Sequence, residues 1–173
     1  MKKERRHILI VKMSSLGDVI LSSPTAQMVK ELEPQSFVGW LVEERNWSVL
    51  KGNPFVDALF IWDRSFQGFL KVMREIRRYE WDVALDQQGL FKSAIFCFLS
   101  GAKTRIGHEE VEHGSRIFYT HLVPNISSLH AVESYLFTAC SLISYFSKEE
   151  FRRALKEGME KVIGREKRLK PVI

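Results

Sequence analysis

An acidic residue stands at the start of the first predicted helix, where a carboxylate can serve as a base. Residues 7–12 contain an unbroken, β-branched apolar run that predicts a strand buried on both faces, and residues 13–17 predict a turn. Asp18 follows, so we expect its carboxylate beside the backbone N–H groups of a helix start, which favour an anion. An aspartate held in that form can remove a proton from a hydroxyl group. On this pattern alone, an ordinary acidic residue at a helix start explains Asp18 equally well.

The turn before Asp18 is poorly suited to bind a dinucleotide. It has one glycine, Gly17, instead of the Gly-x-Gly-x-x-Gly pattern that lets a diphosphate approach the backbone. A carboxylate at a helix start would also repel a diphosphate bound there. We therefore expect no cofactor.

Alternating strand and helix patterns predict the elements that position these residues. Strands are expected at 7–12, 37–42, 58–62, 81–86 and 104–107, and helices at 24–32, 66–80, 89–100 and 129–146, with 108–128 irregular. This alternation predicts an α/β fold, with one Rossmann-like parallel-sheet domain that has helices on both faces. Ligands of such sheets bind beyond the carboxyl ends of the strands.

Polar side chains gather at those predicted carboxyl ends. They follow four of the strands, in chain order: Lys12, Ser14, Ser15 and Asp18; Glu43 and Glu44; Asp86, Gln88 and Lys92; Arg105 and His108. Of the two glutamates, we expect one to be solvated and one to form a wall of the site. Three of these residues also have a simpler interpretation. Lys92 and Arg105 are explained equally well as surface cations, and Asp86 as a residue of a turn.

Four segments, in the same order along the chain, resemble the lipopolysaccharide heptosyltransferases, which are inverting glycosyltransferases of the GT-B class. The segments are Val11-Lys-Met-Ser-Ser-Leu-Gly-Asp-Val19, Trp40-Leu-Val-Glu-Glu44, Asp82-Val-Ala-Leu-Asp-Gln-Gln-Gly-Leu-Phe-Lys-Ser93 and His130-Ala-Val-Glu133. The first and third are specific in combination. The resemblance covers about residues 8–135 and implies the N-terminal half of a GT-B fold.

The resemblance implies transfer of heptose from ADP-heptose to a sugar hydroxyl of the lipopolysaccharide inner core. In that reaction Asp18 is the base that deprotonates the acceptor, and the family has no obligatory metal. The residues implied to bind the anionic acceptor are Lys12, Ser14, Ser15, Gly17, Asp86, Gln88, Gly89, Lys92 and Arg105. This chain departs from the family pattern at Ser134, where many relatives have arginine.

The chain of 173 residues is long enough for one domain and too short for the two of a GT-B enzyme. We expect the Rossmann-like domain to span 1–146, followed at 147–173 by an amphipathic linker helix and the start of a missing C-terminal domain. Ser147-Lys-Glu-Glu150 is a capping box that predicts the beginning of this helix. A separate donor-binding half is the implied partner, and we expect this truncated half to transfer weakly or not at all alone.

The charge distribution argues against nucleic acid as a partner. The net charge of +5 comes from residues 1–6, which carry +3, and residues 148–173, which carry +4, whereas residues 7–147 carry −2. No apolar stretch reaches the roughly 20 residues of a membrane helix, so we expect a cytoplasmic protein. Arg74, Arg77 and Arg78 are either a solvated helix face or a peripheral contact with the anionic inner face of the inner membrane.

The sequence also bears on a metal site and on an alternative function. His108 and His113 are five residues apart, roughly 140° around a helix, which is wrong for a zincin and leaves us expecting no metal site. The alternative function is a non-catalytic, flavodoxin-like α/β module in which the same turn binds a small polar or anionic ligand.

Overall fold

Six parallel strands form the central sheet of the computed structural model, which describes residues 5–123 and 130–140 of the chain. They are β1 (His7–Val11), β2 (Phe37–Glu43), β3 (Ala58–Trp62), β4 (Val83–Asp86), β5 (Thr104–His108) and β6 (His121–Val123). Their order across the sheet is β3-β2-β1-β4-β5-β6, so the order reverses between β1 and β4. Because all neighbours pair in parallel, the carboxyl ends lie along one edge.

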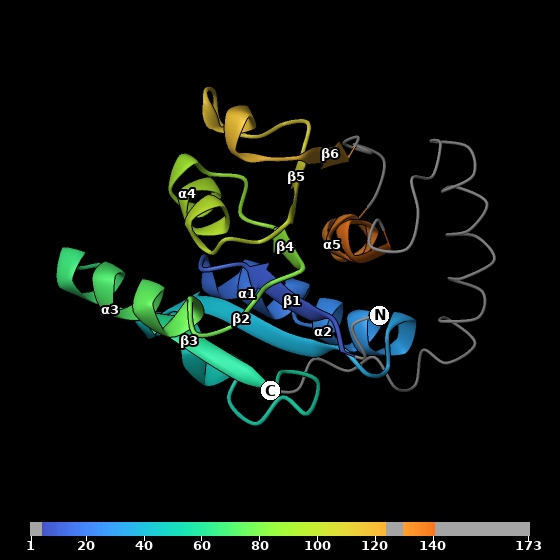
Figure 1. Ribbon diagram of the computed structural model, residues 1–173. Coiled ribbons are helices and arrows are strands. Elements are labelled where there is room, and N and C mark those ends of the chain that lie inside the picture. Colours follow the sequence, from blue (N-terminus) through green and yellow to red (C-terminus); the bar gives the residue numbers. More distant parts are fainter. Residues whose placement is uncertain (1–4, 124–129, 141–173) are drawn as a thin grey trace.

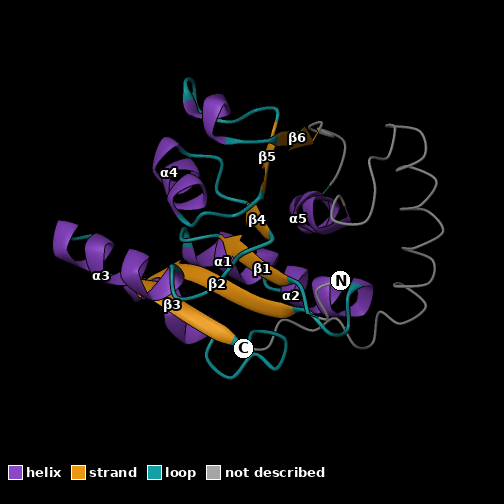
Figure 2. Cartoon of the chain, in the orientation of Figure 1, coloured by secondary structure: helices purple, strands orange, loops and turns teal. Residues whose placement is uncertain are grey.

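Helices cover both faces of this sheet, which confirms the predicted α/β class (Figures 1 and 2). One face carries α1 (Leu16–Ser22), α2 (Pro24–Leu32), the 3₁₀ helix η1 (Glu44–Val49) and α5 (Ala131–Cys140). The other face carries α3 (Phe66–Ile76) and α4 (Phe91–Leu99), with a second 3₁₀ helix, η2 (Ser115–Phe118), beside α4. None of the helices within the described residues has the length and apolar character needed to span a membrane.

Each central strand contributes to two separate apolar cores. Ile8 and Ile10 of β1 pack under α1, α2 and α5, whereas Leu9 and Val11 pack under α3 and α4. Successive side chains of a strand point to opposite faces, so a strand buried on both sides has to be apolar at every position. This is the physical reason for the unbroken apolar run in the sequence. Burying each such side chain contributes about 1.5–3 kcal/mol.

Gly39 of β2 is required by the packing of the second core. A Cβ atom built at this position would lie 2.5 Å from the Trp81 ring and 2.8 Å from the Phe60 ring. The absence of a side chain at Gly39 therefore lets the Trp81 ring approach β2 closely. The Trp81 indole also donates a hydrogen bond of 2.9 Å to the carbonyl of Ile76.

Several predicted bounds and one predicted irregular segment differ from the structure, and the strand expected at 81–86 begins at Val83. The helix expected at 66–80 ends at Ile76, whose carbonyl accepts hydrogen bonds from the Tyr79 amide in a tight turn and from the Trp81 indole. The helix expected from residue 89 begins at Phe91, because Gly89 has a φ of 70° in the turn before it. The segment 108–128, expected to be irregular, contains η2 and also β6, which pairs with β5. The features predicted for residues 141–173 lie outside the described residues.

Candidate active site

The loop between β1 and α1 holds the Asp18 carboxylate at the carboxyl edge of the sheet. Asp18 occupies the third position of α1, and its Oδ2 accepts hydrogen bonds from the Ser15 amide at 3.1 Å and the Ser15 hydroxyl at 2.9 Å. Partial burial alone would raise the pKa of Asp18. The hydrogen bonds from Ser15 and the positive charge of Lys12 outweigh burial, so the pKa is lowered and the carboxylate is ionised at neutral pH.

Lys12 and Tyr135 enclose the other side of this carboxylate. Lys12 lies at the end of β1 with only 4% of its surface exposed, and its ammonium is 4.9 Å from the centre of the Tyr135 ring. The Tyr135 hydroxyl donates to Asp18 Oδ1 over 3.4 Å. Burial lowers the pKa of Lys12, and the nearby carboxylates of Asp18 and Asp86 oppose that effect. Burial, together with Asp18, raises the pKa of Tyr135 to about 12, so the phenol keeps its proton as a donor.

His108, at the end of β5, borders the same group of side chains. Its burial and the positive charge of Lys12 lower the pKa of His108 to about 4, although Glu110 opposes this. The imidazole is therefore neutral at physiological pH. Among the described residues, no group of three or more histidine, cysteine, aspartate or glutamate side chains could hold a metal ion.

Gln88 braces the β1–α1 loop through its backbone. The Oε1 atom of Gln88 accepts hydrogen bonds from the amides of Met13, at 3.1 Å, and Ser14, at 3.0 Å. From the other side of the loop, Asn46 Nδ2 donates to the carbonyl of Met13 over 2.8 Å. The loop that carries Asp18 is thus held by the loops after both β4 and β2. This geometry favours a positioning role for Gln88 over direct contact between its carbonyl and an acceptor.

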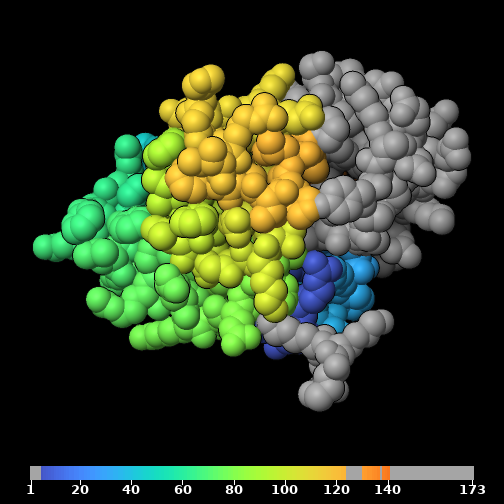
Figure 3. Space-filling view, turned by 45° about the horizontal axis from the view of Figure 1, so that its top comes forward, coloured from blue at the N-terminus to red at the C-terminus, as the bar shows by residue number. Residues whose placement is uncertain are grey.

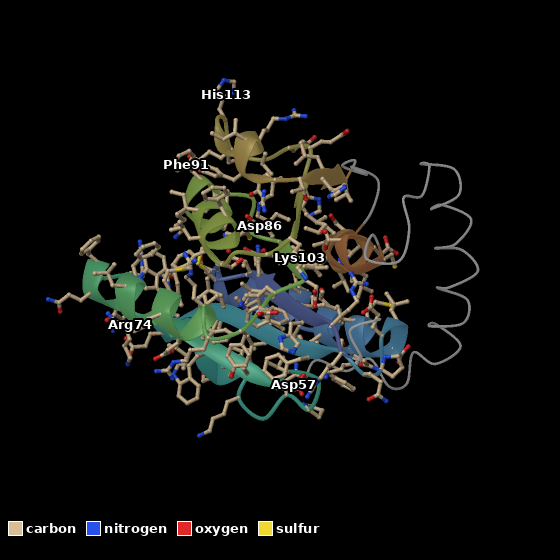
Figure 4. All side chains as sticks on the ribbon, in the orientation of Figure 1. Asp57, Arg74, Asp86, Phe91, Lys103 and His113 are labelled. Atoms are coloured by element: carbon tan, nitrogen blue, oxygen red, sulfur yellow. The ribbon has the colours of Figure 1, made fainter. Side chains whose placement is uncertain are left out.

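Asp86 is fully buried at the end of β4, in the interior of the molecule (Figure 4). Its Oδ1 accepts from the amides of Gln88 at 2.8 Å and Gly89 at 3.0 Å, and its Oδ2 accepts from the Tyr119 hydroxyl at 2.6 Å. Burial raises the pKa of Asp86, and the hydrogen bond from Tyr119 opposes that rise. With both oxygens occupied, Asp86 shapes the turn that contains Gln88 and Gly89.

Arg105 does not join the side chains around Asp18. Successive side chains of a strand point to opposite faces, and Ile106 packs under α5. Arg105 therefore points to the opposite face of the sheet, whereas Lys12 points to the α5 face. The Arg105 guanidinium donates to the carbonyls of Phe118 at 2.6 Å and Ala102 at 2.8 Å. These contacts join η2 to the turn after α4, and the expected acceptor-binding role of Arg105 stays a prediction.

Lys92 takes part in a second charged group, here called the Glu43 cluster, which consists of Glu43, Arg45, Arg64 and Lys92. Glu43 is fully buried, and its carboxylate lies 3.1 Å from Lys92 Nζ, 2.9 Å from Arg45 Nε and 3.9 Å from Arg64 Nε. One carboxylate thus faces three cations, which leaves an excess of two positive charges. Glu44 is exposed, in agreement with the expected division between the two glutamates.

The structure adds residues to the site that the sequence reasoning missed. Arg45 and Arg64 follow the carboxyl ends of β2 and β3, so the rule that selected Lys92 could have selected them as well. No sequence pattern indicates Tyr135, because it lies on α5, 117 positions after the Asp18 that it contacts. Gln87 holds that helix in place, because its Nε2 donates to the Tyr135 carbonyl and the Thr138 hydroxyl, both at 2.8 Å.

The sequence matches known glycosyltransferases. The model of glycosyltransferase family 9 (heptosyltransferase) matches residues 69–161. Lipopolysaccharide heptosyltransferase 1 of Campylobacter coli is 33% identical over 91 residues, which cover 51% of this chain and 27% of that protein. The lipopolysaccharide core heptosyltransferase OpsX of Haemophilus influenzae is 23% identical over 135 residues, which cover 76% of this chain and 39% of that protein. The chain thus spans less than half the length of these relatives.

Solved structures share the fold. A glycosyl transferase family 9 protein from Veillonella parvula superposes with a TM-score of 0.73 at 22% identity, covering 84% of this chain and 44% of that one. The E. coli heptosyltransferase WaaC with ADP gives a TM-score of 0.69 at 23% identity, covering 81% of this chain and 48% of that one. The chain thus covers less than half of the length of each of these two structures. Since the family model matches more than half of the sequence, the chain belongs to glycosyltransferase family 9, the heptosyltransferase family.

Proposed function

We propose that this chain forms the acceptor-binding half of a heptosyltransferase that transfers heptose from ADP-heptose to a hydroxyl of the lipopolysaccharide inner core. The observation that carries the proposal is the ionised Asp18 carboxylate, held between Ser15 and Tyr135 at the carboxyl edge of the sheet. Family membership supports the reaction class. The structural neighbour WaaC has also been solved with ADP-2-deoxy-2-fluoro heptose, which supports the choice of donor.

In the proposed reaction, Asp18 acts as a general base toward the acceptor hydroxyl. Its Oδ2 is occupied by two hydrogen bonds from Ser15, whereas among the described residues Oδ1 has only the long contact of 3.4 Å from Tyr135. Oδ1 is therefore the oxygen that accepts the proton. The acceptor oxygen attacks the anomeric carbon of heptose from the side opposite the diphosphate, and the bond to the ADP oxygen breaks with its electron pair. The product has inverted configuration.

A carboxylate of lowered pKa is a weak base toward a free hydroxyl, so the timing of the proton transfer matters. The hydroxyl becomes strongly acidic only as its oxygen bonds to the anomeric carbon. Asp18 then receives the proton late in the step. The buried Lys12 ammonium stabilises the anion before transfer, and Tyr135 keeps the carboxylate oriented.

We propose that the Glu43 cluster binds an anionic group of the acceptor. The excess of two positive charges favours a phosphate or carboxylate, and hydrogen bonds between charged partners are stronger than neutral ones. The cluster is joined to the base through the backbone, because the Glu43 amide donates to the Met13 carbonyl over 3.2 Å. Above the Asp18 loop, Gly17 has open space around its Cα, which leaves room for a sugar.

The donor belongs to a second Rossmann-like domain in this proposal. Residues 1–146 are the N-terminal domain, and 147–173 lead toward the donor-binding domain. The enzyme acts in the cytoplasm, at the inner face of the inner membrane. A non-catalytic binding module is not favoured, because the family to which the chain belongs consists of transferases.

The test is heptosyl transfer to a lipopolysaccharide inner-core acceptor with a donor-binding half supplied in trans. Asp18→Asn is expected to keep acceptor affinity within about twofold and to lower transfer by about 10²-fold or more, the usual contribution of a general base. Glu31→Gln, which changes an exposed carboxylate on α2, is the matched control and should leave transfer unchanged. Transfer by Asp18→Asn within about tenfold of the control would overturn the assignment of the base.

A further inference from the structure

The helix α3 has an outward face that the fold does not bury. Phe66 is 75% exposed and Leu70 is 47% exposed, whereas Val72, Met73 and Ile76 of the same helix are buried. At about 100° per residue, Phe66 and Leu70 lie one above the other on successive turns. Two neighbouring large apolar side chains on one solvent-facing surface mark a candidate contact surface.

The same outward face is strongly basic. Lys71 and Arg74 are exposed on α3, and Arg77 and Arg78 are exposed in the turn that follows it. Within the described part of the chain, the guanidinium groups of these three arginines have no hydrogen bond or ion pair. The only acid of the helix, Glu75, is partly buried on its flank. The surface therefore has an apolar strip beside three arginines that have no acidic partner among the described residues, whereas Lys71 interacts electrostatically with the nearby Asp63 carboxylate.

We propose that this face of α3, defined by Phe66, Leu70, Lys71, Arg74 and Arg78, binds the surface of an anionic lipid bilayer. A short amphipathic helix with aromatic and aliphatic side chains next to basic ones lies in the plane of the interface. Phe66 and Leu70 enter the boundary between headgroups and acyl chains, while the cations contact lipid phosphates. An acidic protein partner is disfavoured because the apolar residues occupy the same sector as the cations and an anionic bilayer satisfies both at once.

The position of α3 connects this surface to the candidate active site. Phe66 begins the helix directly after the carboxyl end of β3, two residues beyond Arg64 of the Glu43 cluster. In Figure 1 the helix extends away from the sheet at the side of the molecule, and in Figure 3 the green segment that includes it forms the margin. A bilayer bound there lies beside the site edge. The benefit for a lipid-linked acceptor rests on the proposed function, whereas the lipid contact itself does not.

The test is sedimentation of the full chain with vesicles of phosphatidylcholine alone or of phosphatidylcholine mixed with phosphatidylglycerol. The chain should sediment with the anionic vesicles only, and less at high salt. Lys71→Gln combined with Arg74→Gln is expected to lower partitioning by about 25-fold, since each cation near an anionic surface contributes about fivefold. Phe66→Ser combined with Leu70→Ser should lower it by about tenfold or more.

A matched control changes the same residue types elsewhere on the surface. Ile117 is 79% exposed on η2 beside the exposed Arg116, so Ile117→Ser with Arg116→Gln should leave partitioning within about twofold. Because every substituted side chain is exposed, the thermal unfolding midpoints should match that of the wild type. Transfer is not measured, so the outcome is independent of the proposed heptosyl transfer.

Several results would overturn the proposal. Equal binding to both kinds of vesicle would show that the contact does not depend on lipid charge. If the control variant lost as much binding as the α3 variants, the lipid contact could not be assigned to α3. Binding that survives both pairs of α3 substitutions would assign the lipid contact to another part of the chain. A dimer in sedimentation velocity without lipid, abolished by Phe66→Ser, would show that a second copy covers this face instead.

Discussion

Replacement of Gln88 distinguishes a residue that braces the catalytic loop from one that touches the acceptor. The Gln88 carbonyl accepts from two backbone amides of the β1–α1 loop, those of Met13 and Ser14. Gln88→Leu removes the single oxygen that accepts both hydrogen bonds, with little change in side-chain size. Gln88→Glu keeps an oxygen in the same place and adds a negative charge.

The expected loss of stability follows from those two hydrogen bonds. A hydrogen bond contributes about 1 kcal/mol net, and a buried amide left without a partner costs about 1–3 kcal/mol. Met13 is fully buried and Ser14 is half-buried, so water can reach one of the two amides more easily than the other. We expect Gln88→Leu to lower the free energy of unfolding by about 2–3 kcal/mol. Gln88→Glu should lower it by less than about 1 kcal/mol.

Urea unfolding followed by tryptophan fluorescence measures this difference. With a denaturant dependence of about 2 kcal/mol per molar, Gln88→Leu should shift the midpoint down by about 1 M. Gln35→Leu, which changes an exposed glutamine between α2 and β2, is the control and should leave the midpoint in place. Unfolding of Gln88→Leu at the wild-type urea concentration would refute the bracing role.

Acceptor binding supplies the second readout. If Gln88 only positions the loop, Gln88→Glu should bind the acceptor within about threefold of the wild type. If its amide group contacts an anionic acceptor, the added charge should weaken binding by about tenfold or more, as expected for like charges in direct contact. A tenfold loss with unchanged stability would return Gln88 to the acceptor-binding set.

Three further predictions concern the cores and the buried carboxylates. Gly39→Ala should lower the free energy of unfolding by about 1–3 kcal/mol in urea, because the added methyl collides with the Trp81 ring, and an unchanged midpoint would contradict the close contact. Tyr119→Phe removes the 2.6 Å hydrogen bond to the Asp86 carboxylate and should lower it by about 1.5–3 kcal/mol at neutral pH. Since this change raises the pKa of Asp86 further, the loss should be smaller in acid, where Asp86 is protonated, and an equal loss at both pH values would contradict the assigned charge. The lowered pKa of Asp18 stabilises the folded state above the unfolded value of about 4, and this stability is lost as the pH falls through the folded pKa. Asp18→Asn should therefore flatten the acid side of the stability profile in thermal unfolding at graded pH, and a profile as steep as that of the wild type would show that another group causes the decline.

The sequence was sufficient to predict those parts of the fold that depend on local pattern. The strand at 58–62 has the expected bounds, and the apolar run at 7–12 is buried on both faces. The strand β6 escaped prediction because three residues are too few to show a period, and its pairing with β5 defines it. The exposure of Phe66 and Leu70 could not be predicted either, because helical spacing does not show how far a helix extends past the sheet.

The sequence could predict where the candidate site lies, but it could not predict which residues its side chains contact. Strand ends placed Lys12, Asp18 and Lys92 at one edge, and the structure has them there. The rule could not assign partners, because the Gln88 carbonyl binds backbone amides that any residue type would offer. Arg105 shows the related limit, since its sheet face follows from alternation with Ile106 once the register of β5 is known.

The contact between Tyr135 and Asp18 forms late in folding, and with it the candidate active site is completed. The two residues are separated by 117 positions, and the docking of α5 also depends on Gln87 in the middle of the chain. Bringing distant parts of a chain together costs conformational entropy before the contact between them adds stability. During synthesis the first four strands can therefore pair while Asp18 is still open to water. Asp18 acquires its final surroundings only after residues 131–140 have left the ribosome and packed.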